Sequence, residues 1–203
     1  MAAIIGLAIR VWHHRGPIRF DQTLLHGYAP RPASPLFRLT RVLTEIGSPV
    51  AVIILAFTFA AIVWRRQRSW VKAGVCVVAP ALAGVAETAG KVIVGRTRPL
   101  TATLTGERGV GFPSGHAAGF AALALIVALS MSKPGRPRTA AVVGAVLASA
   151  LVAASRVVVG AHYPTDVIAG LLLGLVIADG TWCLAPYVVV RWSHAGTRKF
   201  FGM

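Results

Sequence analysis

The chain has 203 residues, of which 56% are hydrophobic and only 13% are charged, and its mean hydropathy is +0.70. This composition is typical of a membrane protein and excludes an ordinary soluble globule. The formal net charge of +15 would suit nucleic acid. However, the basic residues lie at the ends of long apolar runs with no nucleic-acid-binding module between them, so we exclude nucleic acid as a partner.

Residues 1–46 form an N-terminal segment and connector. Residues 1–9 are apolar, but Arg10 ends this run far short of the roughly 20 residues that a spanning helix needs. Two alternatives stay open: a half-embedded or interfacial helix, or the remnant of a first span. We expect no cleavable signal peptide here. Residues 13–41 are rich in Arg, His and Pro and predict a polar connector with at most short helical pieces, because proline removes a backbone donor and restrains its predecessor.

Five apolar runs follow, and they predict membrane-spanning helices, because backbone polar groups in lipid find partners only within a helix. The runs cover residues 47–64, 71–94, 117–131, 140–159 and 167–190. We therefore expect a single all-α membrane domain over residues 1–203, a bundle of five to six transmembrane helices. Its core would be residues 47–190, followed by a basic cytoplasmic tail at residues 191–203.

The loops at 65–72 and 133–138 and the C-terminal tail carry ten Lys and Arg residues on one side of this bundle. The positive-inside tendency makes that side cytoplasmic, so the opposite rim faces outward. The six arginines of residues 10–41 weaken this orientation if the first run does not cross. Glycine pairs spaced by four, at 115 and 119 and at 170 and 174, predict close helix packing. We favour packing within the bundle, with a dimer face as the alternative. The oligomeric state stays open.

A basic cluster closes the second apolar run. Lys91 lies in the last turn of that run, and Arg96 and Arg98 follow it at the membrane surface. Taken alone, such residues are expected to extend to lipid headgroups. Glu87 lies one turn before Lys91 on the same helix face, and we expect it to neutralise the lysine or to fix its direction.

The second cluster is the turn Gly-Phe-Pro-Ser-Gly-His at residues 111–116, which leads into the third apolar run. Ser114 suits a helix N-cap, and the first turn beyond it offers free N–H groups and a positive dipole end to an anion. Gly115 leaves room where an anion would approach, and His116 lies beside it. A capped helix start with an incidental histidine is the alternative.

The third cluster contains His162 and Asp166, which are one helical turn apart if a helix begins near Pro164. A carboxylate on one imidazole nitrogen fixes the tautomer and leaves the other nitrogen free to attack or to accept a proton. Arg156, at the end of the preceding run, adds a guanidinium suited to bidentate phosphate recognition. Three polar clusters on one membrane face predict a single phosphate site with a histidine nucleophile.

Together the clusters resemble the three-part signature of the type-2 phosphatidic acid phosphatase superfamily, which includes lipid phosphate phosphatases, bacterial acid phosphatases and vanadium haloperoxidases. Order and spacing match over about residues 85–170, in the patterns Lys91-x6-Arg98-Pro99, Pro113-Ser114-Gly115-His116 and Ser155-Arg156-x5-His162-x3-Asp166. The departure is the short N-terminal segment, since the membrane branch of the superfamily typically has six spans.

The resemblance implies a role for each matching residue. His162 would form a phosphohistidine, Asp166 would orient it, and His116 would protonate the leaving oxygen and then activate water. The phosphate oxygens would be held by five positions: Lys91, Arg98, Ser114, Gly115 and Arg156. No metal and no other cofactor is expected. Arg96 and Arg108 lie outside the signature and would contact a second phosphate, the lipid headgroup or only the surface.

The implied function is an integral-membrane lipid phosphatase of the cytoplasmic membrane whose site faces the extracytoplasmic side. Polyprenyl diphosphates such as undecaprenyl diphosphate are the first choice of substrate, followed by phosphatidylglycerol phosphate and phosphatidic acid. A phosphotransferase that passes the same phosphoryl group to an alcohol stays an alternative. A non-catalytic lipid transporter or scaffold is disfavoured because both histidines are present. A haloperoxidase is disfavoured because it is normally a larger, soluble protein.

Overall fold

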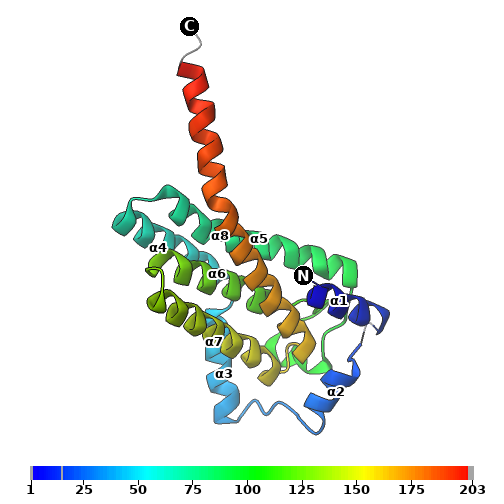
Figure 1. Cartoon of the computed structure of the whole chain (residues 1–203). Coiled ribbons are helices and arrows are strands. Elements are labelled where there is room, and N and C mark those ends of the chain that lie inside the picture. The colour runs from blue at the N-terminus through cyan, green and yellow to red at the C-terminus, as the bar shows by residue number, and fades with distance from the viewer. Residues whose placement is uncertain (1, 15, 201–203) are drawn as a thin grey trace.

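The computed structural model describes residues 2–14 and 16–200, with the side chains of residues 2–5, 14 and 188–200 left out. The described residues form α-helices joined by short loops and one 3-10 helix, and the only strand-like pairing among them is an isolated bridge between Thr97 and Val110. Figure 1 shows their arrangement. The helices are α1 (Ala2–His14), α2 (Arg19–Leu25), α3 (Pro35–Ile46), α4 (Pro49–Gln67), α5 (Trp70–Val94), η1 (Leu100–Thr105), α6 (Gly115–Met131), α7 (Arg136–Val158) and α8 (Pro164–Phe200).

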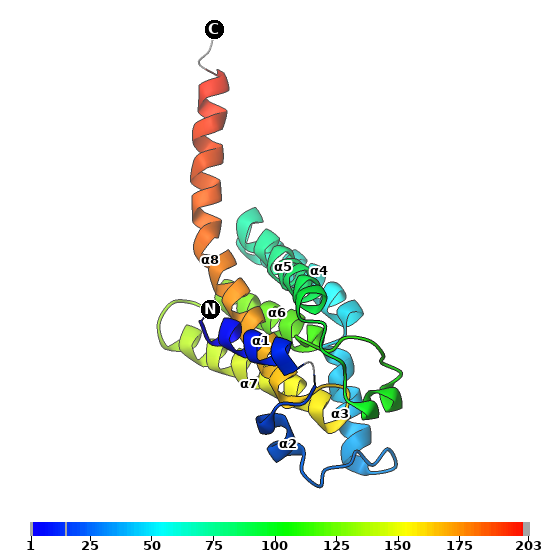
Figure 2. The same cartoon turned by 90° about the vertical axis from the view of Figure 1, so that its right-hand side faces the viewer.

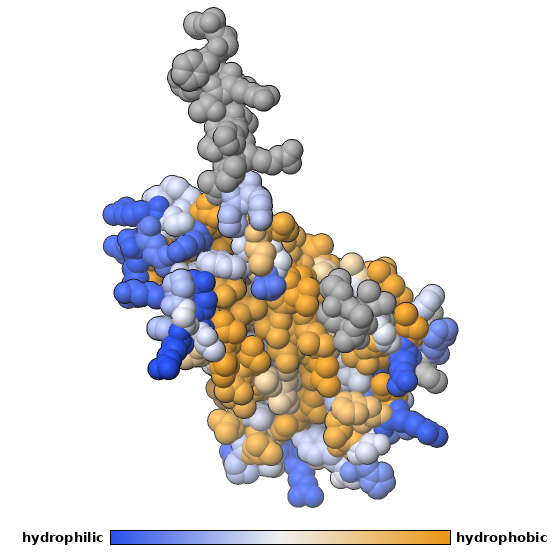
Figure 3. All heavy atoms as spheres, in the orientation of Figure 1, coloured by the Kyte–Doolittle hydropathy of each residue, from blue (hydrophilic) through white to orange (hydrophobic). Residues whose placement is uncertain are grey.

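Within the described part of the chain, four helices are long and apolar enough to cross a membrane: α4, α5, α7 and the Pro164–Tyr187 part of α8. The fifth apolar helix, α6, has 17 residues and is about 26 Å long at 1.5 Å per residue. A broad apolar surface covers the middle of the molecule between more polar ends (Figure 3). The chain is therefore an all-α, multi-pass membrane protein, and the five predicted runs are confirmed as helices.

Capping residues define where the long helices α4 and α5 begin and end. Ser48 and Ser69 cap α4 and α5, because their hydroxyls accept hydrogen bonds from Ala51 N and Lys72 N at 3.2 and 3.3 Å. The C-caps Arg68 and Gly95 adopt left-handed φ angles of 51° and 61°. Each cap N–H returns to a carbonyl of the last turn, which closes the helix.

Helix α6 is the centre of the bundle, in contact with α4, α5, α7 and α8. Its close fit to α8 depends on two glycines. A Cβ at Gly170 would lie 2.3 Å from the carbonyl oxygen of Ser114, and one at Gly174 would lie 2.2 Å from that of Ala118. No side chain fits at either position, so this glycine pair serves packing within the bundle, as predicted, and ties the start of α8 to the start of α6.

The N-terminal segment is more ordered than predicted. Helix α1 has 13 residues and a length of about 20 Å, shorter than a hydrocarbon core of about 30 Å. Its Val11 is buried against Val94 and Phe112. The expected connector at 13–41 contains the seven-residue α2, a short helical piece as expected, and most of the 12-residue α3, which is longer than expected. The reason is local: Ser34 accepts from Phe37 N at 3.1 Å and Pro35 occupies the first turn, where proline favours a helix.

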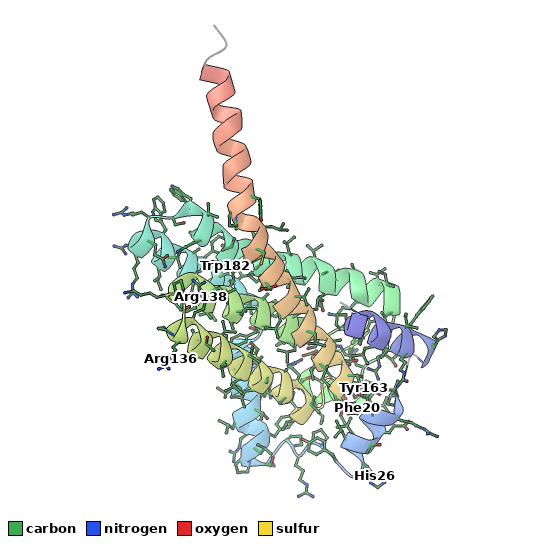
Figure 4. The ribbon with its side chains drawn as sticks, in the orientation of Figure 1. Phe20, His26, Arg136, Arg138, Tyr163 and Trp182 are labelled. Atoms are coloured by element: carbon green, nitrogen blue, oxygen red, sulfur yellow. The ribbon has the colours of Figure 1, made fainter. Side chains whose placement is uncertain are left out.

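The two ends of the bundle differ. At one end Arg138 lies 5.7 Å from the ring of Trp182, and Gln67 donates to Ser130 O at 2.8 Å, which brings the basic loops 65–72 and 133–138 together. Tyr163 and Phe20 lie at the opposite end (Figure 4), where α2 and α3 also gather (Figure 2). The side chains of the predicted basic tail lie outside the described residues, and so do residues 201–203 altogether.

Candidate active site

His162 lies in the turn between α7 and α8, and α8 begins at Pro164 as predicted. Its Nδ1 is 3.5 Å from Asp166 Oδ2, and its Nε2 is 2.8 Å from Arg98 Nη1. Because arginine can only donate, Nε2 must accept, so the imidazole proton resides on Nδ1 and faces the carboxylate. Burial lowers the pKa of His162 to about 4, although Asp166 opposes this shift. The ring is thus neutral at pH 7, with its lone pair on Nε2.

Two guanidiniums face this nitrogen. Arg98 follows α5, and Arg156 lies in the last turn of α7, where its Nη1 donates to Thr44 Oγ1 at 2.9 Å. The carboxylate of Glu107 bridges the two, with one oxygen on each arginine. Its Oε2 is 3.9 Å from His162 Nε2. A carboxylate clamped by two arginines beside a histidine marks an anion-binding position.

Several polar atoms around this position lack partners. Six buried side-chain atoms of the described residues lack a hydrogen bond, and all but Arg138 Nε belong to this region: Glu87 Oε1, Arg98 Nε, Ser114 Oγ, Arg156 Nε and His162 Nδ1. Ser114 is the N-cap residue of α6, as predicted, but its hydroxyl makes no capping bond, and its backbone N–H donates to Asp166 O at 3.0 Å. Buried donors without partners are uncommon, and here they can bind the oxygens of a phosphate.

Lys91 and Glu87 form an ion pair across one turn of α5, as their spacing predicts. A Cβ at Gly115 would lie 2.8 Å from Glu87 Oε1. The space next to Gly115 is therefore occupied by Glu87, not left open for an anion as expected. The Glu87 side chain thus lies between the end of α5 and the first turn of α6, which carries His116.

One cavity of about 900 Å³ reaches most of these groups, but Ser114 and Arg156 do not line it. The charged and polar residues that line it are Glu87, Thr88, Lys91, Arg98, Glu107, His116 and His162. The remaining wall is mostly apolar and comes from α4 and α5. It includes Ile53, Phe57 and Val85, which are 57%, 61% and 68% exposed on the outside of the bundle. The cavity thus has a charged end and an apolar side among lipid-facing helices.

The structure brings the predicted residues of all three clusters to one end of the bundle. Arg96 lies there too, but its contacts differ from those predicted. Arg96 is fully buried and pairs with Asp21 and Asp166. It does not line the cavity or reach the surface, so the three alternatives expected for it are wrong. Arg108 is exposed.

Sequence reasoning missed Glu107 and Asp21. Glu107 pairs with Arg98 and Arg156, and Asp21 pairs with Arg96, and none of these pairs has the spacing of neighbours on one helix face, so no spacing rule points to them. One signal was present: the chain has only six acidic residues, and four of them lie in this region. In a basic membrane protein, scarce carboxylates mark positions where charge is needed.

Comparisons with known proteins agree with this geometry. The model of the PAP2 superfamily matches residues 70–189, more than half of the chain. The fold is similar to a crystal structure described as the first transmembrane PAP2-type phosphatidylglycerolphosphate phosphatase from Bacillus subtilis. The TM-score is 0.79 at 20% sequence identity, over 92% of this chain and 96% of that chain. No curated protein sequence gives a significant match. The chain therefore belongs to the PAP2 superfamily, the type-2 phosphatidic acid phosphatases, and is a membrane phosphoric ester hydrolase.

Proposed function

We propose that the chain hydrolyses the phosphate or diphosphate group of a membrane lipid through a phosphohistidine on His162. The observation that carries this proposal is a cavity that joins a cluster of cationic and histidine side chains to an apolar wall on α4 and α5. The charged end suits a phosphate group, and the apolar wall suits the lipid tail that carries it. A soluble substrate would have no use for that wall.

In the first step, the lone pair of His162 Nε2 attacks the terminal phosphorus. The bond from that phosphorus to the leaving oxygen breaks; this is the lipid ester oxygen of a monoester or the bridging oxygen of a diphosphate, which leaves on the lipid monophosphate. His116 gives its proton to that leaving oxygen. The Nδ1 proton of His162 stays between the ring and Asp166, whose negative charge stabilises the imidazolium that forms. Arg98 must first release Nε2, and its guanidinium then serves the phosphoryl oxygens.

In the second step, His116 takes a proton from water, and the resulting hydroxide attacks the phosphohistidine. Inorganic phosphate leaves and neutral His162 is restored. Charge on the three equatorial oxygens is stabilised throughout by donors of the site, after the phosphate has displaced the Glu107 carboxylate from the two arginines. These donors are Lys91, Arg98, Arg156, the Ser114 hydroxyl and the Gly115 N–H.

A polyprenyl diphosphate is the first choice of substrate. Phosphatidylglycerol phosphate is the second candidate, because the similar Bacillus subtilis structure is described as a phosphatase for that lipid and its chain is covered almost completely. The chemistry at phosphorus is the same for both, so the substrate preference is a property of the apolar wall. A phosphotransferase would use the same phosphohistidine with an alcohol in place of water.

The test is phosphate release by purified full-length protein from four substrates: a polyprenyl diphosphate, phosphatidylglycerol phosphate, phosphatidic acid and a soluble phosphomonoester. We expect kcat/KM for at least one lipid to exceed that for the soluble ester by about a hundredfold or more, since tail binding adds several kcal/mol. Chelator should have no effect. Equal rates on the soluble ester would refute the role of the wall, and phosphate transfer to added alcohol without phosphate release would indicate the phosphotransferase.

Two glycines of α5 provide a matched pair of variants. Gly84 lines the apolar wall, whereas Gly74 does not, and a Cβ at either position meets nothing within 4 Å. Gly84→Phe should fill the wall and raise KM for the lipid by about tenfold without changing the rate on the soluble ester. Gly74→Phe should leave both unchanged. If the two variants behave alike, the lipid tail does not use this wall.

We further propose that the site faces the extracytoplasmic side of the cytoplasmic membrane. The support is the seven Lys and Arg residues in the loops 65–72 and 133–138, at the end opposite to the site. In a cysteine-free background, Thr103→Cys should react with an impermeant thiol reagent in intact cells. Lys133→Cys should react only after permeabilisation. Both positions are exposed, so the reverse pattern would invert the orientation.

A further inference from the structure

A second group of charges lies behind His162, on the side away from the cavity. Arg96, Asp21 and Asp166 are each 0% exposed, and Thr165 is 2% exposed. Asp21 comes from α2, Arg96 from the loop after α5, and Asp166 from the first turn of α8. Three ionised side chains buried together are costly unless they are paired and fully hydrogen-bonded.

The contacts of Arg96 meet that condition. Its Nη1 donates to Thr165 Oγ1 at 2.6 Å and to Asp166 Oδ1 at 2.5 Å, while Nη2 donates to Asp21 Oδ2 at 2.5 Å. Nε and Nη2 also donate to the carbonyl oxygen of Gly16, at 3.2 and 2.9 Å. With its nitrogens engaged in this way, Arg96 has no donor to offer a phosphate.

Asp21 and Asp166 are held from several sides. Asp21 Oδ1 accepts from both N and Oγ1 of Thr165 at 2.9 Å. Asp166 divides its two oxygens: Oδ1 receives Arg96, whereas Oδ2 receives Tyr163 N at 3.0 Å and faces His162 Nδ1 at 3.5 Å. Arg96 therefore sets the rotation of the carboxylate that faces the histidine.

The charges add a second effect. Arg96 alone would cancel the negative charge of Asp166, and the imidazole would gain little from its carboxylate. Asp21 balances Arg96, so the group keeps a net charge of −1 next to Nδ1. That charge stabilises the imidazolium that forms when Nε2 attacks phosphorus.

We propose that Arg96 and Asp21 are positioning residues for the phosphatase reaction: Arg96 holds Asp166 against His162, and Asp21 keeps the charge of Asp166 effective. The N-terminal segment thus contributes to the active site through α2. This inference rests on the proposed function, because it assumes that His162 is the nucleophile.

The experiment measures kcat/KM as a function of pH for neutral variants of Asp21 and Arg96. The readout is the acid limb of this profile, the pH at which activity falls because protonation of His162 removes its lone pair. Asp21→Asn removes a negative charge, lowers the proton affinity of the imidazole and should move the limb to lower pH by about half to one unit. Arg96→Met removes a positive charge and should move it to higher pH by a similar amount. The double variant should return the limb close to its wild-type position.

The rate constants give a second readout. Asp21, Arg96 and Asp166 do not line the cavity. We therefore expect kcat to fall by about tenfold or more in each single variant, because a misplaced orienting group slows the chemical step, with KM changed by less than about twofold. Controls are Asp179→Asn and Arg38→Met, two exposed residues outside the site.

Other charged groups also face His162 and act on the same limb, but none of them is altered in these variants. Arg98 and Glu107 lie within 4 Å of the ring, Arg156 acts on it through its charge, and Lys91 and His116 line the same cavity. If Arg96 and Asp21 only stabilised the fold, their variants would yield less folded protein, and the acid limb would not move in opposite directions. The proposal would be overturned if both single variants moved the acid limb in the same direction. It would also be overturned if the double variant combined the kcat losses of the two single variants.

If Asp21→Asn does not fold, Arg96→Met alone must still move the acid limb of kcat/KM to higher pH. Asp21→Glu must leave the pH of that limb unchanged while it lowers kcat. Failure of either would also overturn the proposal. Failure of the proposed function is a different result: wild-type protein would release no phosphate from any lipid, and no His162 label would form.

Discussion

Arginine and carboxylate side chains lie on both sides of His162, but they have different roles on the two sides. On the cavity side, Arg98 and Arg156 share the carboxylate of Glu107, which is 23% exposed, and each keeps a buried Nε without a partner. On the inner side, Arg96 is 0% exposed and its nitrogens are bound to fixed protein groups. The comparison shows that burial alone does not distinguish a binding arginine from a structural one. Arg98 and Arg156 differ from Arg96 in their unpaired donors, although Arg138 at the opposite end of the bundle also has a buried Nε without a hydrogen bond. An unpaired donor therefore indicates a binding arginine only where other groups of the site surround it.

The largest loss of turnover should come from substitution of His162, which lies between the two sides. His162→Ala removes the nucleophile, and we expect turnover to fall by more than about 10⁴-fold, as for other enzymes that lose a covalent nucleophile. Protein incubated with ³²P-labelled lipid and quenched in base should carry acid-labile label only in the wild type. Label that persists in the variant would assign the nucleophile to another residue.

The cavity side should be next in sensitivity. Arg156→Lys keeps the charge but loses the planar fork, so kcat/KM should fall by about a hundredfold, because an ammonium cannot replace two aligned donors in the transition state. Arg38→Lys is the matched exposed control. A loss no larger than that of the control would show that Arg156 acts only through its contacts to Thr44 and Glu107.

The pH dependence tests which form of His162 reacts. The pKa of His162 is lowered to about 4 by burial, so the ring is neutral and active above that value and protonated below it. We expect kcat/KM to fall by about tenfold per pH unit below pH 4. The limb should stay in place when a monoester replaces a diphosphate. A limb that follows the ionisation of the substrate would belong to the substrate instead.

The smallest effect concerns Glu107, and it has the opposite sign. Its carboxylate holds the arginines that a phosphate would need, so substrate must displace it. Glu107→Gln keeps the size but removes the charge, and we expect the Kd for vanadate to fall by several-fold to about tenfold, because a competing bound state is weakened. Asp179→Asn should not change the Kd. Weaker vanadate binding in Glu107→Gln would mean that Glu107 supports the site rather than competes for it.

Much of this arrangement could be predicted from local sequence. Apolar runs gave the helices because a chain in lipid has few alternatives to a helix. The pair His162 and Asp166 could be placed together because four residues make one helical turn, and Glu87 and Lys91 follow the same rule. These predictions depend on short-range geometry, which residue spacing determines.

The rest depends on long-range contacts. Asp21 and Asp166 are linked through Arg96 across more than a hundred residues, and Glu107 reaches Arg156 from a loop. Loop side chains such as Arg96 have no periodicity that indicates their direction. Gly115 was assigned to an open anion site because its partner in space, Glu87, could not be identified from the spacing of the turn.

The apolar wall of the cavity has a consequence for how turnover should be measured. Ile53, Phe57 and Val85 border the cavity and also face outward on α4 and α5. A substrate that diffuses within the bilayer can therefore meet the site from the side, without passing through water. The search is then two-dimensional, and the rate should follow the mole fraction of substrate in the membrane rather than its concentration in the sample.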